Sequence, residues 1–348
     1  MGPQTPVLST VLGSGPGAAV IVILAATAVV WVGSAWLERS AEGLSAHYGL
    51  PPVVQGSVVV AVGSSFPELA SVVVTALTGI FDMGVGAIVG SAIFNVLVIP
   101  GLAALATEEP LESNRAIVYK EAQFYMIAVS VIVITFALAV IYVPVPGGNG
   151  LQGLITRPLA LLPLLLYGLY VFIQWQDVSD HVAPEPPEEV DLARAWAKLA
   201  GGLLLIVVAI EQLVGGVEVV GATFGVPEFL AGMTIIAAAT SIPDALVSVR
   251  SARGGSHVTS LGNVLGSNTF DLLVAIPIGV LIAGATSVDF ATAVPMFGVL
   301  TLATVALFAV LRTDLTLSTQ EAVGLLLAYL LFVAWVGAES AGLTHIVK

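Results

Sequence analysis

The sequence of 348 residues contains no cysteine and few charged residues. The absence of cysteine excludes disulfide bonds and thiolate metal sites. Charged residues make up 9% of the chain and hydrophobic residues 57%, whereas soluble domains carry about a quarter charged residues. The composition therefore excludes a soluble domain and predicts an integral membrane protein.

Histidine is also scarce, and its positions argue against an enzyme. The four histidines all lie at predicted span ends or in loops: His47, His181, His257 and His345. A serine protease working inside the membrane needs a serine and a histidine at depth, and no histidine occurs in mid-span. The Tyr-Asp and Gly-X-Gly-Asp motifs of intramembrane aspartyl proteases are absent around Asp244 and Asp271. We expect no enzymatic activity.

Apolar runs long enough to cross a bilayer occur ten times and predict an all-α membrane protein. The predicted spans are 17–37, 51–78, 84–106, 119–143, 156–175, 193–222, 227–250, 258–284, 289–311 and 319–340. An acidic, proline-rich segment divides them into two sets of five. The expected organisation is a first half at 1–176, a flexible linker at 177–192 and a second half at 193–348.

Lysine and arginine predict the orientation, because cytoplasmic loops carry an excess of both. With the N-terminus outside, eight of the ten fall at cytoplasmic ends, and only Arg157 and Lys348 fall outside. The eight are Arg39, Arg115, Lys120, Arg194, Lys198, Arg250, Arg253 and Arg312. Both termini are therefore predicted outside and the linker in the cytoplasm. The segment Met1 to Gly15 lacks the basic region of a signal peptide, so no cleavable leader is expected.

An internal repeat organises the chain. Residues 49–95 align without a gap with residues 225–271, at a constant offset of 176. Identical pairs include Gly56/Gly232, Ser65/Ser241, Pro67/Pro243, Ser91/Ser267 and Phe94/Phe270, and similar pairs are Ser64/Thr240, Glu68/Asp244 and Asn95/Asp271. Five spans per half is an odd number, so the second half enters the membrane inverted. This is the plan of secondary transporters, here with repeats at about 49–100 and 225–276.

The repeats place an acid beside a proline in the middle of a span. The stretches are Gly63-Ser-Ser-Phe-Pro-Glu68 and Ala239-Thr-Ser-Ile-Pro-Asp244. A carboxylate at that depth is costly and usually functional. Proline removes a backbone donor, so we expect the second and seventh helices to break beside their acids.

The polar groups of both repeats would form a site made of oxygen alone. Carboxylates come from Glu68, Asp244 and Asp271, and an amide from Asn95. The remaining oxygens are the hydroxyls of Ser65, Ser91, Ser241 and Ser267 and the carbonyls of Ala61, Ser64, Ala237 and Thr240. Calcium takes several oxygens, sodium suits hydroxyls and carbonyls, and zinc or copper prefers nitrogen or sulfur. Two nearby carboxylates repel each other when the site holds no cation. A site loaded with a cation is therefore favoured over an empty one, which suits the exchange of one cation for another.

The spaced glycines of the repeats have a structural interpretation, and the role of Glu211 stays open. Gly86 and Gly90, like Gly262 and Gly266, are small residues four apart, which predicts close packing of the helix carrying Ser91 and Asn95 against the broken helix. Glu211 lies well inside the sixth predicted span without an acidic partner at the offset of 176, and its role stays open.

These motifs resemble the cation/calcium exchanger superfamily, specifically sodium/calcium exchangers. The resemblance rests on the two stretches above and on Gly90-Ser-Ala-Ile-Phe-Asn95 and Gly266-Ser-Asn-Thr-Phe-Asp271, and the ten-span layout extends it over the chain. It implies a calcium/sodium antiporter working by alternating access, with the long first and sixth spans sliding over the others. A prokaryotic cell membrane is the expected location. The expected partners are lipid and inorganic cations, with no cofactor, nucleic acid or obligate protein partner.

The resemblance also implies roles for single residues. Calcium would be held by Glu68, Asp244 and the carbonyls of Ser64 and Thr240. Sodium would be held by the same two acids with Ala61, Ser65, Ser91, Ala237, Ser241 and Ser267. Asn95 and Asp271 would complete the centre.

Alternatives stay open at this point. Many prokaryotic relatives carry Glu at the position of Asp244. The Asp of this chain resembles the potassium-dependent branch of the family, and Asp271 is compatible with potassium co-transport. Many prokaryotic relatives also carry Asn where this chain has Ala87 and Ala92. A proton/calcium antiporter and a cation channel built on the same acids are further alternatives, ranked below sodium/calcium exchange.

Overall fold

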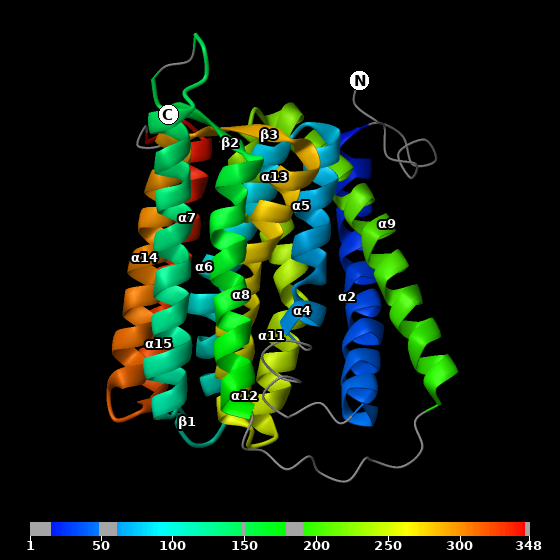
Figure 1. Ribbon diagram of the computed structural model, residues 1–348, viewed down its shortest axis with the longest axis vertical. Coiled ribbons are helices and arrows are strands. Elements are labelled where there is room, and N and C mark those ends of the chain that lie inside the picture. The colour runs from blue at the N-terminus through cyan, green and yellow to red at the C-terminus, as the bar shows by residue number, and fades with distance from the viewer. Residues whose placement is uncertain (1–14, 49–60, 148–149, 179–190, 345–348) are drawn as a thin grey trace.

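The computed structural model describes residues 15–48, 61–147, 150–178 and 191–344, which form one bundle of long, roughly aligned helices (Figure 1). The first half contains α2 (Pro16–His47), α4 (Ala61–Ser64), α5 (Phe66–Thr78), α6 (Phe81–Leu105), the π-helical turn η2 (Ile117–Ala122), α7 (Gln123–Tyr142) and α8 (Arg157–Val178). The second half contains α9 (Leu192–Phe224), α10 (Glu228–Ala231), η3 (Gly232–Ile236), α11 (Ala237–Arg253), α12 (His257–Phe270), η4 (Asp271–Ala275), α13 (Ile276–Ala283), α14 (Phe290–Arg312) and α15 (Thr319–Ser340).

Nine helical segments in the described residues are long and apolar enough to cross a membrane. They correspond to nine of the ten predicted spans. The other predicted span, 51–78, contains α4 and the shorter apolar α5, while its residues 51–60 lie outside the described part. The prediction of a largely helical, multi-span membrane protein is therefore confirmed.

The second and seventh helices differ from each other at the predicted breaks. In the first half, α4 ends at Ser64 and α5 begins at Phe66, with Pro67 in its first turn. In the second half, α11 runs without interruption through Pro243, so the predicted break at Ala239 to Pro243 is wrong. The irregularity lies one turn earlier, in the π-helical turn η3, because a wide turn also relieves the strain of a mid-helix proline.

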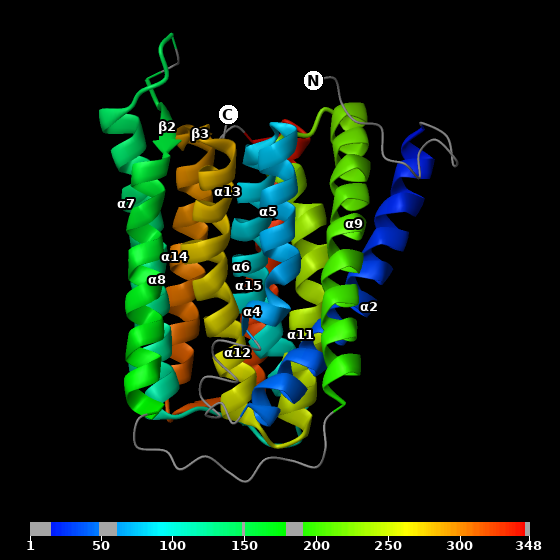
Figure 2. The same cartoon turned by 45° about the vertical axis from the view of Figure 1, so that its right-hand side comes forward.

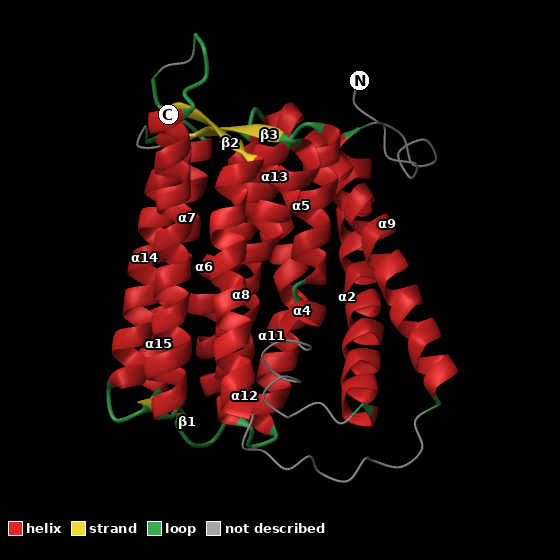
Figure 3. Ribbon diagram, viewed as in Figure 1, coloured by secondary structure: helices red, strands yellow, loops and turns green. Residues whose placement is uncertain are grey.

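Four short strands interrupt the predicted all-α fold. β1 (Leu111–Glu112) pairs antiparallel with β4 (Thr316–Leu317), and β2 (Gln152–Thr156) pairs antiparallel with β3 (Ala285–Asp289). The two ribbons lie at opposite ends of the bundle (Figure 3). Strands of two to five residues carry too little alternation to be recognised in a sequence, and they connect the two halves of the chain at each end.

The helices α2 and α9 form a pair at one side of the bundle (Figure 2). They cross closely at glycines: a side chain at Gly33 would meet Ile206, and one at Gly202 would meet the Gly33 carbonyl at 2.8 Å. α2 extends beyond the predicted span 17–37 to His47, because Ala41 and Leu44 remain buried after Leu37.

The helix α6 lies at the centre and joins the two halves. It is buried on nearly all sides. Gly86 and Gly90 bring its backbone against the carbonyls of Phe229 and Met233, on α10 and η3. The prediction of close packing at these glycines is confirmed for α6, but they contact the irregular helix of the other half of the chain. This cross-packing places Ser91 and Asn95 beside α11.

Candidate cation site

The two predicted acids lie in mid-bundle on elements that the sequence shapes differently. Glu68 is in the first turn of α5, which begins at the interruption around Ser65, so it faces the positive end of that helix. Asp244 lies within the continuous helix α11, directly after Pro243. Both side chains are buried, at 1% and 0% exposure.

The other predicted polar residues of the site are buried with these two acids. Each has a relative exposure of 0%. They are Ser64, Ser65, Ser91, Asn95, Thr240, Ser241, Ser267 and Asp271. Ala237 is also buried, and the surroundings of the Ala61 side chain lie outside the description. A group of polar side chains without solvent contact is costly unless its members find partners, so their contacts decide what the site can do.

Ser91 connects the two halves at the first acid. Its hydroxyl lies 3.3 Å from Glu68 Oε1, to which it donates, and 2.8 Å from the hydroxyl of Ser241. Ser91 is on α6 and Ser241 is on α11. The two serines that the sequence placed in separate repeats therefore contact each other.

Asn95 makes the corresponding connection at the second acid. Its amide donates to Asp244 Oδ2 at 3.2 Å and to Asn268 Oδ1 at 2.9 Å. Asn268 in turn donates to the carbonyl of Ala92 at 3.1 Å and to the Tyr125 hydroxyl at 3.2 Å. Asn268 and Ala92 are separated by 176 residues, so equivalent positions of the two repeats contact each other.

The contacts of the two acids follow the same offset. Glu68 lies beside the hydroxyls of Ser91 and Thr240. Asp244 lies beside those of Ser267 and Ser64. Glu68 and Ser91 correspond to Asp244 and Ser267 at the offset of 176. Ser64 and Thr240 also correspond to each other, and each lies beside the acid of the other half. The contacts of the two acids are therefore equivalent at the offset of 176.

Several oxygens of this group have no hydrogen-bond partner within the described residues. They are Ser65 Oγ, Glu68 Oε2, Asn95 Oδ1, Asp244 Oδ1 and both carboxylate oxygens of Asp271. All are oxygens that can accept, and five of the six cannot donate when the acids are ionised. Unpaired buried acceptors are costly, and a hard cation satisfies several at once. The donor set fits calcium or sodium.

The acids alone do not make the site. Within the described part of the chain, no three histidine, aspartate or glutamate side chains lie close enough together to hold a metal ion. A cation held between Glu68 and Asp244 would therefore need hydroxyl, amide and backbone oxygens as its other ligands. Such a mixed set has fewer charges than a resident calcium site and releases its ion more readily.

Sequence reasoning missed two members of the network, Asn268 and Tyr125. Asn268 lies within the stretch Gly266 to Asp271. It aligns with Ala92 in the first repeat, so a comparison of the repeats did not select it. Its polar side chain in the middle of a span was the available signal. Glu211, whose role stayed open, has an exposed side chain on α9 and takes no part in this site.

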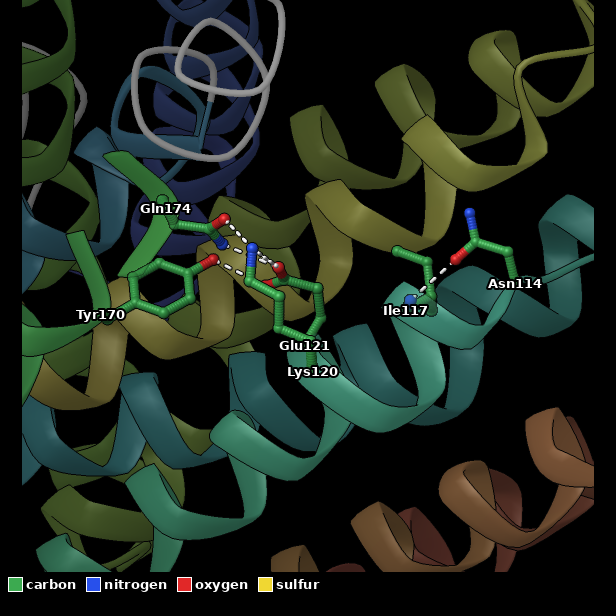
Figure 4. Close-up of polar contacts among 6 residues, drawn as sticks. All are labelled: Asn114, Ile117, Lys120, Glu121, Tyr170 and Gln174. Carbon is green, nitrogen blue, oxygen red and sulfur yellow. Dashed lines mark hydrogen bonds and ion pairs between the residues drawn. The ribbon is translucent and has the colours of Figure 1, made fainter. Parts of the chain in front are cut away.

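The partly buried Glu121 shows what a fully hydrogen-bonded carboxylate looks like in this bundle. Glu121 accepts hydrogen bonds from Tyr170 at 2.8 Å and from Gln174 at 2.7 Å, and Lys120 lies 3.7 Å from it (Figure 4). Both of its oxygens are paired. Glu121 therefore ties η2 to α8, whereas Glu68 and Asp244 each keep one free oxygen.

Comparisons with known proteins show the family and support the fold. The family model described as "Sodium/calcium exchanger protein" matches residues 18–176 and 194–338. The inner membrane protein YrbG of Escherichia coli (strain K12) is 29% identical, over 75% of this chain and 81% of its own length. The putative antiporter CaxA of Alkalimonas amylolytica is 27% identical, over 76% and 81%. A solved structure of the sodium-calcium exchanger NCX_Mj covers 91% of this chain and 97% of its own, with a TM-score of 0.62 at 19% identity, and supports the fold.

Proposed function

Because the chain belongs to the sodium/calcium exchanger protein family, we propose that it is a secondary antiporter that exchanges calcium for sodium by alternating access. The observation that carries this proposal is the pair Glu68 and Asp244, each buried in mid-bundle with one unpaired carboxylate oxygen. Similarity to exchangers supports cation and calcium antiport as the class of activity.

The proposed calcium ligands are the carboxylates of Glu68 and Asp244 and the carbonyls of Ser64 and Thr240. The proposed sodium ligands are the same acids with Ala61, Ser65, Ser91, Ala237, Ser241 and Ser267. Asn95 and Asp271 flank the centre. Support comes from the burial of the described members of this set and from the contacts of the acids with Ser91, Ser241 and Asn95.

The energetic basis of exchange is repulsion in the empty site. At about 4 Å two unit charges repel by about 4 kcal/mol at an effective dielectric constant of 20, and the buried acids have little water to screen them. One calcium or several sodium ions remove this cost. A vacant site is therefore the unfavourable state, and movement of the bundle is favoured when the site is loaded.

We further propose that the halves are inverted repeats. The bounds of α2 and α9 correspond closely at the offset of 176, as do those of α6 and the α12–α13 segment. The turn between α5 and α6 lies at one end of the bundle and the turn between α11 and α12 at the other (Figure 1). β1 corresponds to part of β3 at the offset of 176, and β2 and β4 each lie between the last two helices of their half.

We place both termini outside. The helices α2, α11 and α14 carry their arginines toward the end of the bundle where α8 ends and α9 begins (Figure 1). Arg194 and Lys198 begin α9 at that end. An excess of basic residues marks the cytoplasmic side. We call this end the linker end.

The test is calcium-45 flux in proteoliposomes, with sodium, potassium and proton gradients imposed one at a time. Sodium-driven uptake that is absent in Glu68→Gln and Asp244→Asn is the expected result. Normal flux in either variant would overturn the site. Dependence on potassium together with sodium, or on protons alone, would change the coupling ion, and currents without any gradient coupling would indicate a channel.

A further inference from the structure

A second buried polar cluster lies outside the site described above. It consists of Ser248 on α11 and of Ser260 and Asn263 on α12, with exposures of 0%, 1% and 5%. The Asn263 amide donates to Ser248 Oγ at 3.3 Å, and Ser248 Oγ donates to the Ser260 carbonyl at 3.4 Å. We call these three residues the Ser248 cluster.

The cluster contains two unpaired oxygens. Asn263 Oδ1 and Ser260 Oγ are buried and have no hydrogen-bond partner among the described residues. A buried acceptor left without a partner costs about 1–3 kcal/mol. Both hydrogen bonds that do form are long, so the cluster is not organised around its own contacts. Its free oxygens point to a donor or a cation that occupies it during function.

The cluster continues the central site toward the linker end. Ser248 lies four residues after Asp244 on α11, and Asn263 lies four residues before Ser267 on α12. Residues four apart lie on the same helical face, one turn or about 6 Å away. Ser260 lies a further turn along α12. The polar face that carries Asp244 and Ser267 therefore extends past the site toward the turn between α11 and α12.

The first half of the chain has no equivalent. At the offset of 176, Ser248, Ser260 and Asn263 correspond to Val72, Gly84 and Ala87, whose side chains offer no oxygen. Val72 and Ala87 are buried. The nearby Thr75 hydroxyl donates to its own helix, to the carbonyls of Ser71 and Val72. Among the described residues, the three positions equivalent to the Ser248 cluster therefore provide no matching group of side-chain oxygens on the other side of the central site.

We propose that the Ser248 cluster is a transient binding site for a monovalent cation on the route between the central carboxylates and the linker end. Its oxygens are neutral hydroxyl, amide and carbonyl groups. Calcium prefers a set with several carboxylates, whereas a singly charged ion such as sodium is held by neutral oxygens. The proposal rests on the proposed function for the direction of transport, but binding itself can be measured without flux.

The absence of cysteine allows a direct test. In Ser260→Cys a membrane-impermeant, positively charged methanethiosulfonate is applied from each side, and Arg253→Cys marks the linker end. We expect modification from the linker end. Sodium should slow it roughly tenfold at ten times the half-protecting concentration, because only empty sites react. Choline should not slow it, and Ala87→Cys, at the position equivalent to Asn263, should stay unmodified from the opposite end.

Two combined variants separate local binding from a conformational response. Protection by sodium should persist when Glu68→Gln is added to Ser260→Cys and should disappear when Asn263→Leu is added. Protection lost in Glu68→Gln would mean that sodium acts from the central site, and would overturn the proposal. No modification from the linker end, or no effect of sodium, would also overturn it, with Ser248→Cys used if Ser260→Cys does not fold. Failure of wild-type calcium flux would overturn only the proposed function.

Discussion

The hydroxyls of Ser91 and Ser241 lie 2.8 Å apart, although 150 residues separate them in the chain. Ser91 also donates to Glu68, so one side chain of α6 contacts both an acid of the first half and a serine of the second. The contact exists because Gly90 lets α6 approach the helix that carries Ser241. Neither half therefore contains this polar network alone, and the proposed cation site lies where the halves meet.

The unpaired oxygens of the site predict how neutralisation changes stability. In Glu68→Gln we expect a higher thermal midpoint in calcium-free buffer, because a buried charge with an unpaired oxygen is removed. We also expect calcium to stop stabilising the protein. In the unchanged chain, calcium at one hundred times its dissociation constant should stabilise the folded state by about 2.7 kcal/mol. Thermal unfolding in detergent with and without calcium measures both effects.

The matched control for this prediction is Glu211→Gln. Glu211 is also an acid within a predicted span, but its side chain is exposed on α9. Its neutralisation should leave the shift by calcium unchanged. A calcium shift of normal size in Glu68→Gln would remove that carboxylate from the site.

Asn268 predicts a separate effect on calcium binding. In Asn268→Ala the amide of Asn95 loses its 2.9 Å partner, and the hydrogen bonds to Ala92 and Tyr125 are lost as well. Since one net hydrogen bond is worth about 1 kcal/mol, we expect the half-saturating calcium concentration to rise about fivefold. Tyr125→Phe, which removes one of these bonds, should show a smaller increase. Calcium-dependent flux measures both, and a loss of maximal rate at unchanged half-saturation would contradict a positioning role.

Much of the site could be predicted from the sequence, because mid-span polar residues are rare and the constant offset selects those that occur in pairs. Glu68, Asp244, Ser91 and Asn95 were found this way. Asn268 was missed because its equivalent is Ala92, and a comparison of repeats selects only positions that carry similar residues in both halves. Its contacts depend on how the two halves pack, which no pattern within one half contains.

The helix breaks show a second limit. Proline predicts an irregular helix but not where the irregularity lies. At Pro67 the chain interrupts the helix one or two residues earlier. At Pro243 the helix continues, and the wide turn is at Gly232 to Ile236. Gly232 packs against the Met83 carbonyl, so tertiary contact with α6 decides where the turn opens. The directions of backbone carbonyls near each acid follow from this packing.

A larger residue at Gly90 is expected to disturb the contact of α6 with η3 and α11. In Gly90→Ala the new Cβ would lie against the Met233 carbonyl and 2.8 Å from Ala237 Cβ, closer than packed atoms tolerate. We expect α6 to move away from η3 and α11, which separates Ser91 from Ser241. Overpacking of this kind costs about 1–3 kcal/mol, and calcium flux should fall even in protein that still folds.

The control for this variant is Gly298→Ala on α14. A Cβ at Gly298 meets nothing within 4 Å, and alanine favours a helix over glycine by about 1 kcal/mol, so this change should be neutral or slightly stabilising. Flux and thermal stability of the two variants, measured in parallel, separate the loss of glycine from the loss of space. If Gly90→Ala retains full flux at unchanged stability, the close approach of α6 to the second half is not what assembles the site.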